Sequence, residues 1–477
     1  QSFLQFHPMA HQFPILLIDK VLSKTRKSPL TPDSEIRFSR KYLFLFLFLS
    51  TLYACSDNRS KRSGKVFIEQ KDGNFTLFRN GKPFEIKGAA GSEHLDLLAE
   101  LGGNTIKTWD TTHIDSILKK ANEANIAVII GLPIPESKHM YFYNDDVMVA
   151  NQFKAIKKLV NRVKNNPSVL MWCVGNELVF PHKPSYNKFY KGFNDIVDMI
   201  HSDDPDHPVT TTMINFQRKT IFNLKMRTNV DIISFNIFGK IGSLSQELKD
   251  FSWFWKGPYL LTEWGIDGPW DGTAETVWGA KIEQTSTKKA EQYYARYKEQ
   301  MPVNDQRLLG SFIFYWGQKQ ETTHTWFSIF DEAGNKTEVV DAAEAIWKGK
   351  QLTSIAPKIN YMLLNSKGAQ DDIFLKPNEK NTAEVFMLNG DANIKKIVWE
   401  IYPEDWYKIN NLNNTKKPLL IKGLIEHTQD LRAVFNTPLK EGPYRIFATI
   451  YGDKGYVATC NTPFYVLKTD EDSRASN

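Results

Sequence analysis

The sequence predicts a β/α barrel of eight parallel strands, followed by an antiparallel β-sandwich. Eight short apolar segments alternate with helical patterns between residues 84 and 350. Alternation of this kind is typical of successive βα units, and a span of about 270 residues is close to the ~250 of a single closed barrel. From residue 354 onward the sequence pattern changes to short runs of β-forming residues, separated by Asn, Gly, Asp and Lys. Such runs are typical of a sandwich.

Positive charge is concentrated at the front of the chain. The formal net charge is +6, and residues 1–65 contain eleven Lys or Arg against four Asp or Glu, so the remainder is close to neutral. A protein that binds the phosphates of a nucleic acid needs a basic surface on its folded body. The charge distribution therefore predicts no nucleic-acid partner.

The same region contains an apolar run at residues 42–54, preceded by Arg37, Arg40 and Lys41. The run is too short to span a bilayer as a helix and is typical of a signal peptide. It ends in Leu52-Tyr53-Ala54-Cys55, which resembles the cleavage box of bacterial lipoproteins. We therefore interpret residues 1–55 as an upstream segment with a lipoprotein signal peptide. Cys55 would be lipidated and would anchor the protein to a bacterial membrane. The outer membrane is the favoured location. The alternative is an ordinary secretion signal with an incidental Cys.

The predicted domains follow in order. Two apolar runs around Lys71-Asp72-Gly73-Asn74 indicate a hairpin at the start of a barrel domain over 66–352, and a sandwich domain covers 356–468. The expected barrel strands are 84–90, 104–108, 126–132, 169–175, 208–213, 231–236, 258–263 and 310–316, with helices such as 96–101, 114–124, 147–163 and 189–200. The expected sandwich strands are 361–364, 383–387, 396–402, 432–435, 444–451, 456–460 and 464–467.

Two further cysteines, Cys173 and Cys460, lie far apart and read as small buried hydrophobic residues. The histidines are scattered over different loops without the spacing of metal ligands. The sequence therefore predicts neither a metal site nor a cofactor, and it leaves the oligomeric state open.

Two of the expected strands end in a glutamate. The fourth closes on Gly175-Asn176-Glu177, and the seventh on Thr262-Glu263-Trp264-Gly265. The carboxyl ends of barrel strands are where such barrels place their active sites. A lone Glu at a strand end is more often a helix cap or an ion-pair partner. Two of them suit glycoside hydrolysis, in which one carboxyl group donates a proton and the other attacks or guides water.

Residues 165–177 resemble the signature of glycoside hydrolase clan A, and they are closest to the TIM-barrel domain of glycoside hydrolase family 2. Residues 78–84 resemble that family's entry to its first strand. The resemblance implies that Glu177 is the acid/base, that Glu263 is the nucleophile and that Asn176 holds the sugar 2-hydroxyl. A retaining reaction then requires carboxyl groups about 5–5.5 Å apart, a raised pKa at Glu177 and an ionised Glu263.

Aromatic residues near strand ends are candidates for sugar stacking, because a ring face fits the apolar face of a pyranose. The resemblance assigns Trp316, at the end of the eighth strand, as the floor of the cleavage site. Trp109, Trp264 and Trp270 are candidate subsite walls.

Two polar residues complete the predicted substrate contacts, Asn236 at the end of strand six and Glu321 shortly after strand eight. The chain also departs from the clan pattern twice. Lys107 stands where the clan often has Arg, and Phe238 stands where a Tyr commonly faces the nucleophile. A related clan A family of bacterial endo-glucanases, with a barrel and a C-terminal immunoglobulin-like domain, fits the sequence as well as family 2.

The predicted function is a retaining O-glycosyl hydrolase that cleaves a β-linked oligo- or polysaccharide outside the cell, with an endo-β-1,3-glucanase preferred. The alternatives are an exo-acting β-galactosidase or β-mannosidase, a transglycosylase, or a surface lipoprotein that binds glycans without cleaving them. The C-terminal domain resembles immunoglobulin-like modules of polysaccharide-degrading enzymes. Support of the barrel by packing is preferred over glycan binding for this domain.

Overall fold

The computed structural model describes residues 65–388, 394–404 and 416–468. All of them belong to one compact unit. The predicted segment 1–55, including Cys55, lies outside the described residues. In the part of the chain that the structure describes, no helix combines the length and the apolar character needed to cross a bilayer.

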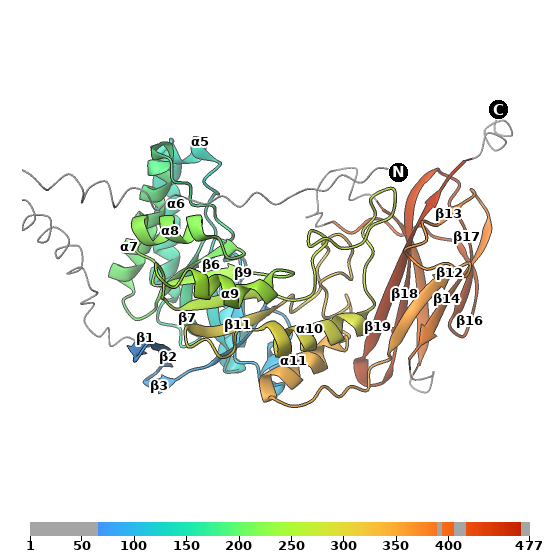
Figure 1. The fold of residues 1–477 in the computed structure, drawn as a ribbon, viewed down its shortest axis with the longest axis horizontal. Helices are drawn as coiled ribbons and strands as arrows, with labels where there is room; N and C mark the ends of the chain where they lie inside the picture. The colour runs from blue at the N-terminus through green and yellow to red at the C-terminus, as the bar shows by residue number, and fades with distance from the viewer. Residues whose placement is uncertain (1–64, 389–393, 405–415, 469–477) are drawn as a thin grey trace, which may run out of the picture. The chain divides into compact units, whose positions relative to one another are not determined.

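Eight parallel strands pair side by side and close into a barrel, which confirms the predicted fold class (Figure 1). Each lies at one of the eight predicted positions. Around the barrel, the strands follow one another in sequence order, and the eighth pairs with the first. The strands are β4 (Ile86–Ala90), β5 (Thr105–Lys107), β6 (Ala127–Leu132), β7 (Val169–Val174), β8 (Val209–Ile214), β9 (Ile232–Asn236), β10 (Tyr259–Trp264) and β11 (Leu308–Phe314).

The apolar run before Gly175 forms β7, and all six of its side chains are buried. Both faces of a barrel strand are covered, one by the barrel interior and the other by helices, so a continuous apolar run is the expected sequence. This strand therefore brings the following Asn-Glu pair to the carboxyl end of the barrel on a rigid support.

Helices connect the strands and pack outside the barrel. In α6, for example, Asp145 caps the N-terminus by accepting from two backbone N–H groups, and Ile156, Val160 and Val163 form its buried face. The helices are α3 (Leu95–Glu100), α4 (Ile114–Glu123), α5 (Met140–Tyr143), α6 (Asp146–Val163), α7 (Asn187–Asp203), α8 (Arg218–Arg227), α9 (Ile241–Asp250), α10 (Ser286–Gln300) and α11 (Val339–Lys348), with short 3-10 turns at Pro184–Tyr186 and Asp453–Gly455.

The predicted hairpin forms a small antiparallel sheet at the opposite end of the barrel from the catalytic candidates. Its strands are β1 (Val66–Lys71), β2 (Asn74–Arg79) and β3 (Lys82–Pro83). The backbone N–H groups of Val66 and Phe75 donate to the carbonyls of Asp206 and Gln306, each at 2.9 Å. Both carbonyls lie just before a barrel strand, so the hairpin covers the amino ends of the strands.

The C-terminal domain contains two four-stranded sheets with a shared apolar core, in agreement with the predicted sandwich. One strand, β19, spans two predicted segments, because residues 461–463 continue the pairing with β18 without a break. The eight strands are β12 (Ile359–Leu364), β13 (Phe374–Leu375), β14 (Lys380–Met387), β15 (Lys396–Pro403), β16 (Ile425–Gln429), β17 (Arg432–Asn436), β18 (Gly442–Tyr451) and β19 (Val457–Val466). The strand order is β12–β14–β17–β16 in one sheet and β13–β19–β18–β15 in the other.

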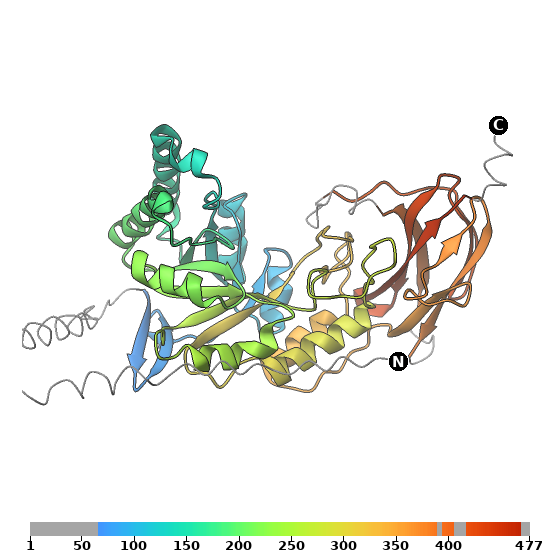
Figure 2. The same cartoon turned by 45° about the horizontal axis from the view of Figure 1, so that its top comes forward.

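The sandwich contacts the barrel through the last two helices, which lie next to β19 in both views (Figures 1 and 2). The Tyr456 hydroxyl donates to Asp341 of α11 at 2.5 Å, and the Thr459 backbone N–H donates to the Ser286 hydroxyl of α10 at 2.9 Å. These contacts are buried. The two domains therefore share a polar interface as well as a covalent connection.

Candidate active site

The two glutamates lie at the carboxyl ends of strands four and seven, as predicted. Glu263 is the fifth residue of β10, and Glu177 follows β7 by three residues. The backbone turns sharply before Glu177, since Gly175 has φ +74° and Glu177 itself has φ +54°. A Cβ atom on Gly175 would lie 2.3 Å from the side chain of Leu178. This turn therefore requires glycine, and it holds Glu177 in a left-handed conformation that is uncommon for a residue with a side chain.

A chain of hydrogen bonds connects the two glutamates. The Asn236 amide donates to Glu177 Oε1 at 2.9 Å and to Asn176 Oδ1 at 3.4 Å. Lys107 Nζ donates to the same Asn176 oxygen and to Glu263 Oε1, both at 2.8 Å. The structure thus brings together four of the predicted site residues, together with Lys107, from β5, β9, β10 and the end of β7. We name this set the carboxylate bridge.

Glu263 receives two donors on one oxygen. Lys107, whose side chain is fully buried, and the indole N–H of Trp109 both reach Oε1, at 2.8 and 2.6 Å. Among the described residues, the structure shows no donor to the other oxygen, Oε2. A buried cation compensates the negative charge of this carboxylate, and a carboxylate so held keeps one oxygen available for attack.

Glu177 has the opposite electrostatic environment. Burial and, after it, the negative charge of Glu263 raise its pKa to about 7, although the hydrogen bond from Asn236 and the charge of Lys107 act in the other direction. Near neutral pH, Glu177 therefore holds a proton in a substantial fraction of molecules. One carboxyl group that can donate a proton and one that is paired with a cation are the two roles that glycoside hydrolysis requires.

Glu321 belongs to the same site. Its buried carboxylate forms an ion pair with Lys319 at 2.6 Å. Burial raises the pKa of Glu321, Lys319 opposes the rise, and the charge of Glu263 adds to it. Glu321 also contributes to the raised pKa of Glu177. Glu321 therefore interacts electrostatically with both catalytic candidates, and its contact with substrate stays a prediction.

Aromatic side chains surround this polar centre. Trp109 stacks on Tyr315 with ring centroids 5.5 Å apart, and it meets the edge of Phe314 at 5.9 Å. Trp270 is 44% exposed and stacks on Phe327 at 5.7 Å. Trp109 therefore lies at the site itself. Trp270 presents an open surface on the loop after β10, and its contact with sugar stays a prediction.

Two of the predicted tryptophans do not reach the site. The side chains of Trp264 and Trp316 are fully buried. Trp264 packs against Tyr293 of α10 at 5.8 Å, because neighbouring side chains of a strand point to opposite faces and Glu263 occupies the inner one. Trp316 packs against Trp347 of α11 at 5.5 Å. Both tryptophans belong to the hydrophobic core, so their assignments as sugar wall and sugar floor are wrong.

Three site residues were missing from the predicted set: Lys107, Tyr315 and Lys319. Lys107 had a visible signal, since a lysine inside a short buried strand needs a carboxylate partner. Tyr315 stands next to the tryptophan that the resemblance selected, and its side chain is partly exposed whereas Trp316 is buried. Nothing in the local sequence marks Lys319, because its partner Glu321 lies in the same irregular loop.

A metal ion has no evident place in the described part of the chain. Nowhere in it do three or more His, Cys, Asp or Glu side chains gather in a way that could hold one. Cys173 and Cys460 are both free and buried.

Comparison with known proteins supports the family resemblance. Residues 122–324 match the family model of the glycosyl hydrolases family 2 TIM barrel domain. A β-glucuronidase from Rattus norvegicus is 27% identical over 221 residues, which cover 39% of this chain and 32% of that protein. A β-glucuronidase from Streptococcus agalactiae is 24% identical over 287 residues, which cover 50% of this chain and 47% of that protein. The matched region is less than half the length of these curated relatives.

Solved structures with similar folds include two further glycosidases. A β-glucuronidase from Bifidobacterium dentium, complexed with coumarin-3-O-glucuronide, has a TM-score of 0.48 at 18% identity and covers 61% of this chain and 50% of its own. The endo-β-1,4-mannanase from Thermotoga petrophila has a TM-score of 0.39 at 15% identity and covers 82% of this chain and 99% of its own.

The charge of Glu263 raises the pKa of Glu177, and this interaction can be tested by substitution. In a Glu263→Gln variant, the pKa of Glu177 should fall below about 7, because the neutral amide removes the second-largest cause of the shift while burial remains. Titration of carboxyl carbons by NMR in labelled protein measures this pKa. Glu321→Gln is the matched control and should change the pKa of Glu177 less, since Glu321 contributes least among the causes. An unchanged Glu177 pKa in Glu263→Gln would contradict the coupling.

Proposed function

We propose that this glycoside hydrolase family 2-like TIM barrel is the catalytic domain of a retaining β-glycosidase, with Glu177 as acid/base and Glu263 as nucleophile. The single observation that supports this most strongly is the carboxylate bridge. It joins two strand-end glutamates, one with a pKa raised to about 7 and the other paired with Lys107. An ion pair that only stabilised the fold would not require a second glutamate with a raised pKa in the same hydrogen-bonded network.

In the first step, Glu263 Oε2 attacks the anomeric carbon of the sugar. Glu177 transfers its proton to the glycosidic oxygen, so the bond to the leaving group breaks and the aglycone departs as an alcohol. A covalent glycosyl-enzyme ester remains. Lys107 and Trp109 hold Oε1 throughout, which orients the attacking oxygen.

The second step reverses the role of Glu177. The ester at Glu263 has no charge, so the charge of Glu263 no longer raises the pKa of Glu177. Glu177, which has given up its proton in the first step, therefore stays ionised and can act as a base. It removes a proton from water as the water oxygen attacks the anomeric carbon, and Glu263 leaves as a carboxylate. Asn176, which accepts from Lys107, would hold the sugar hydroxyl next to the anomeric carbon, as the family resemblance implies.

The charges of the site favour a neutral sugar as substrate. The two lysines placed there, Lys107 and Lys319, already pair with Glu263 and Glu321. A substrate carboxylate would have to compete with these carboxylates and would be repelled by them. This supports an uncharged β-linked glycan over the β-glucuronides that the names of the curated relatives suggest. Endo-acting cleavage of a β-1,3-glucan is our preferred specificity. Exo-acting β-galactosidase or β-mannosidase activity and transglycosylation are the competing specificities.

A substrate panel tests this proposal. Purified protein lacking residues 1–55 is assayed on aryl β-glucoside, β-galactoside, β-mannoside and β-glucuronide, and on β-1,3-glucan with sizing of the products. We expect turnover of a neutral β-glycoside, with Glu177→Gln about 10²–10⁴-fold slower and Glu263→Gln at background. Release of long fragments from β-1,3-glucan would indicate endo action.

Two outcomes would overturn parts of this assignment. Preferred cleavage of the β-glucuronide would contradict the neutral substrate. The second outcome is glycan binding without turnover that Glu177→Gln and Glu263→Gln leave unchanged. It would contradict the enzyme assignment and would indicate a surface lipoprotein that only binds glycans.

We further propose that the enzyme is lipid-anchored in a bacterial cell envelope and acts on extracellular glycan. The support is sequence alone: the basic residues before the apolar run at 42–54 and the Leu-Tyr-Ala-Cys box that ends at Cys55. Lipidation of Cys55 would keep the barrel at the membrane surface.

Substitution of the proposed lipidation site tests the anchor. In a bacterial host, the parent protein should fractionate with membranes and incorporate labelled palmitate, whereas Cys55→Ala should do neither, because the acyl chains are lost. Cys173→Ala is the control for loss of a thiol elsewhere. Membrane association and labelling that persist in Cys55→Ala would exclude this anchor.

A further inference from the structure

The carboxylate of Glu283, just before α10, accepts hydrogen bonds from four side chains. Oε1 accepts from Lys289 at 2.5 Å and from Thr325 at 2.8 Å. Oε2 accepts from Thr323 at 2.5 Å and from Asn461 at 2.8 Å. Glu283 and Lys289 are almost completely buried. Although burial opposes ionisation, Lys289, the Thr323 hydroxyl and the charge of Arg445 outweigh it and lower the pKa of Glu283. A buried carboxylate with four donors fixes the position of all of them.

Two of these donors belong to the segment that contains Glu321. Thr323 and Glu321 exchange backbone hydrogen bonds, at 2.8 and 3.0 Å, around Thr322, which has φ +64°. Lys289 also donates to the Thr325 carbonyl at 2.6 Å. Residues 321–325 are therefore held by Glu283 and Lys289 at one side, while the Glu321 carboxylate interacts with the catalytic glutamates at the other.

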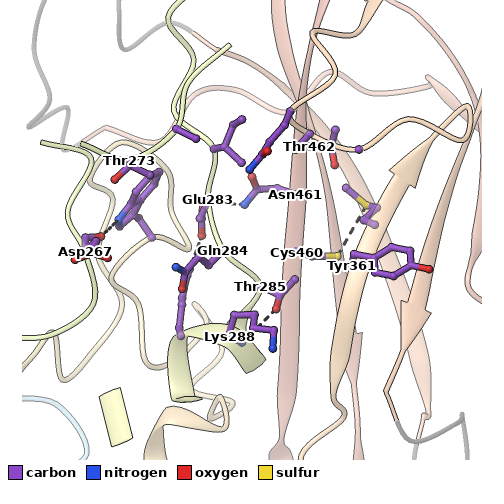
Figure 3. Close-up of a pocket in the computed structure, with 18 of the residues that line it drawn as sticks. Asp267, Thr273, Glu283, Gln284, Thr285, Lys288, Tyr361, Cys460, Asn461 and Thr462 are labelled. Atoms are coloured by element: carbon purple, nitrogen blue, oxygen red, sulfur yellow. Dashed lines mark hydrogen bonds and ion pairs between the residues drawn. The ribbon is translucent and has the colours of Figure 1, made fainter. Parts of the chain in front are cut away.

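The fourth donor comes from the sandwich. Asn461 of β19 donates to Glu283 and accepts from Arg445 of β18 at 2.6 Å. Arg445 in turn holds Glu404 with two hydrogen bonds and reaches the Lys281 carbonyl of the barrel at 2.7 Å. Figure 3 shows Asn461 pointing from the sandwich toward Glu283, beside a cavity of about 730 Å³ between the loop after β10 and the sandwich.

Packing alone does not require this arrangement. The sandwich already contacts α10 and α11 through Thr459 and Tyr456. The Asn461 contact differs because it leads, through Glu283 and Thr323, to the backbone that positions Glu321. The neighbouring ring of His324 also packs on Phe447 of β18, with centroids 4.4 Å apart. The whole segment thus lies between the active site and the sandwich.

We infer that Glu283 and Asn461 are positioning residues that hold Glu321 in the active site, so that the sandwich completes the substrate-binding side of the barrel. The inference rests on the proposed function for the role of the site, and it adds a role for the C-terminal domain beyond packing. Asn461 touches no reacting atom and acts only through Glu283 and the segment 321–325.

Asn461→Asp tests this inference with a substitution of equal size. It replaces the N–H donor 2.8 Å from Glu283 with an oxygen, so two carboxylates face each other in a buried site. Asn381→Asp is the matched control. Asn381 is also buried in the sandwich, donates to the Glu379 carbonyl and accepts from Asn365. Among the described residues, it has no hydrogen bond to the barrel.

Below the melting temperature of both variants, Asn461→Asp should lower kcat/KM about tenfold, mainly through KM, whereas Asn381→Asp should keep parental kinetics. The loss should shrink at acidic pH, where the introduced carboxyl group is protonated. In a Glu321→Gln background, Asn461→Asp should add little, because both changes act on one contact. Parental kinetics in Asn461→Asp, with only a lower melting temperature as in the control, would overturn the inference.

Hydrogen exchange separates this inference from the proposed enzyme activity. If the parent protein cleaves no β-glycoside, the proposed function fails, but backbone amides at 321–326 should still exchange faster in Asn461→Asp than in Asn381→Asp. Equal exchange in the two variants would show that the sandwich does not hold this segment.

Discussion

The ion pair between Lys107 and Glu263 is the interaction on which the rest of the site depends. Two carboxyl groups share a poorly solvated pocket, and both cannot be negative there without compensation. Lys107 compensates Glu263, and Glu177 avoids the conflict because its pKa is about 7. Removal of one partner of a buried pair typically costs about 3–5 kcal/mol, since the other charge is left uncompensated. The chemistry and the stability of the barrel mouth therefore have a common origin.

The barrel makes this pair possible by the register of its parallel strands. Lys107, Asn236 and Glu263 belong to three different strands, β5, β9 and β10, whose carboxyl ends converge at one mouth. The alternation of side chains decides which residues face it. Thus Glu263 points inward while its neighbour Trp264 supports the helical layer. The sandwich also contributes to the position of site residues, because its buried Asn461 donates to Glu283, which in turn accepts from Thr323 in the segment that contains Glu321.

The sequence was sufficient to predict the eight barrel strands, because short, largely apolar segments alternate with helical patterns, and to predict the pair of glutamates at the carboxyl ends of two of them. It was not sufficient to show that Tyr315, and not the adjacent Trp316, lies at the site. Long-range partners were also invisible. Lys107 and Glu263 are separated by 156 positions, and Glu283 and Asn461 by 178. Such contacts follow from strand closure and domain packing, which no local pattern contains.

Double displacement by two carboxyl groups determines the stereochemistry of the product, which is therefore the most direct test of the proposed mechanism. Proton NMR can record the anomeric signals of the first sugar released from a β-glycoside, before mutarotation equilibrates them. We expect the β-anomer to form first, because attack by Glu263 and then by water inverts the anomeric carbon twice. Initial formation of the α-anomer would show a single displacement by water and would contradict the role of Glu263 as nucleophile.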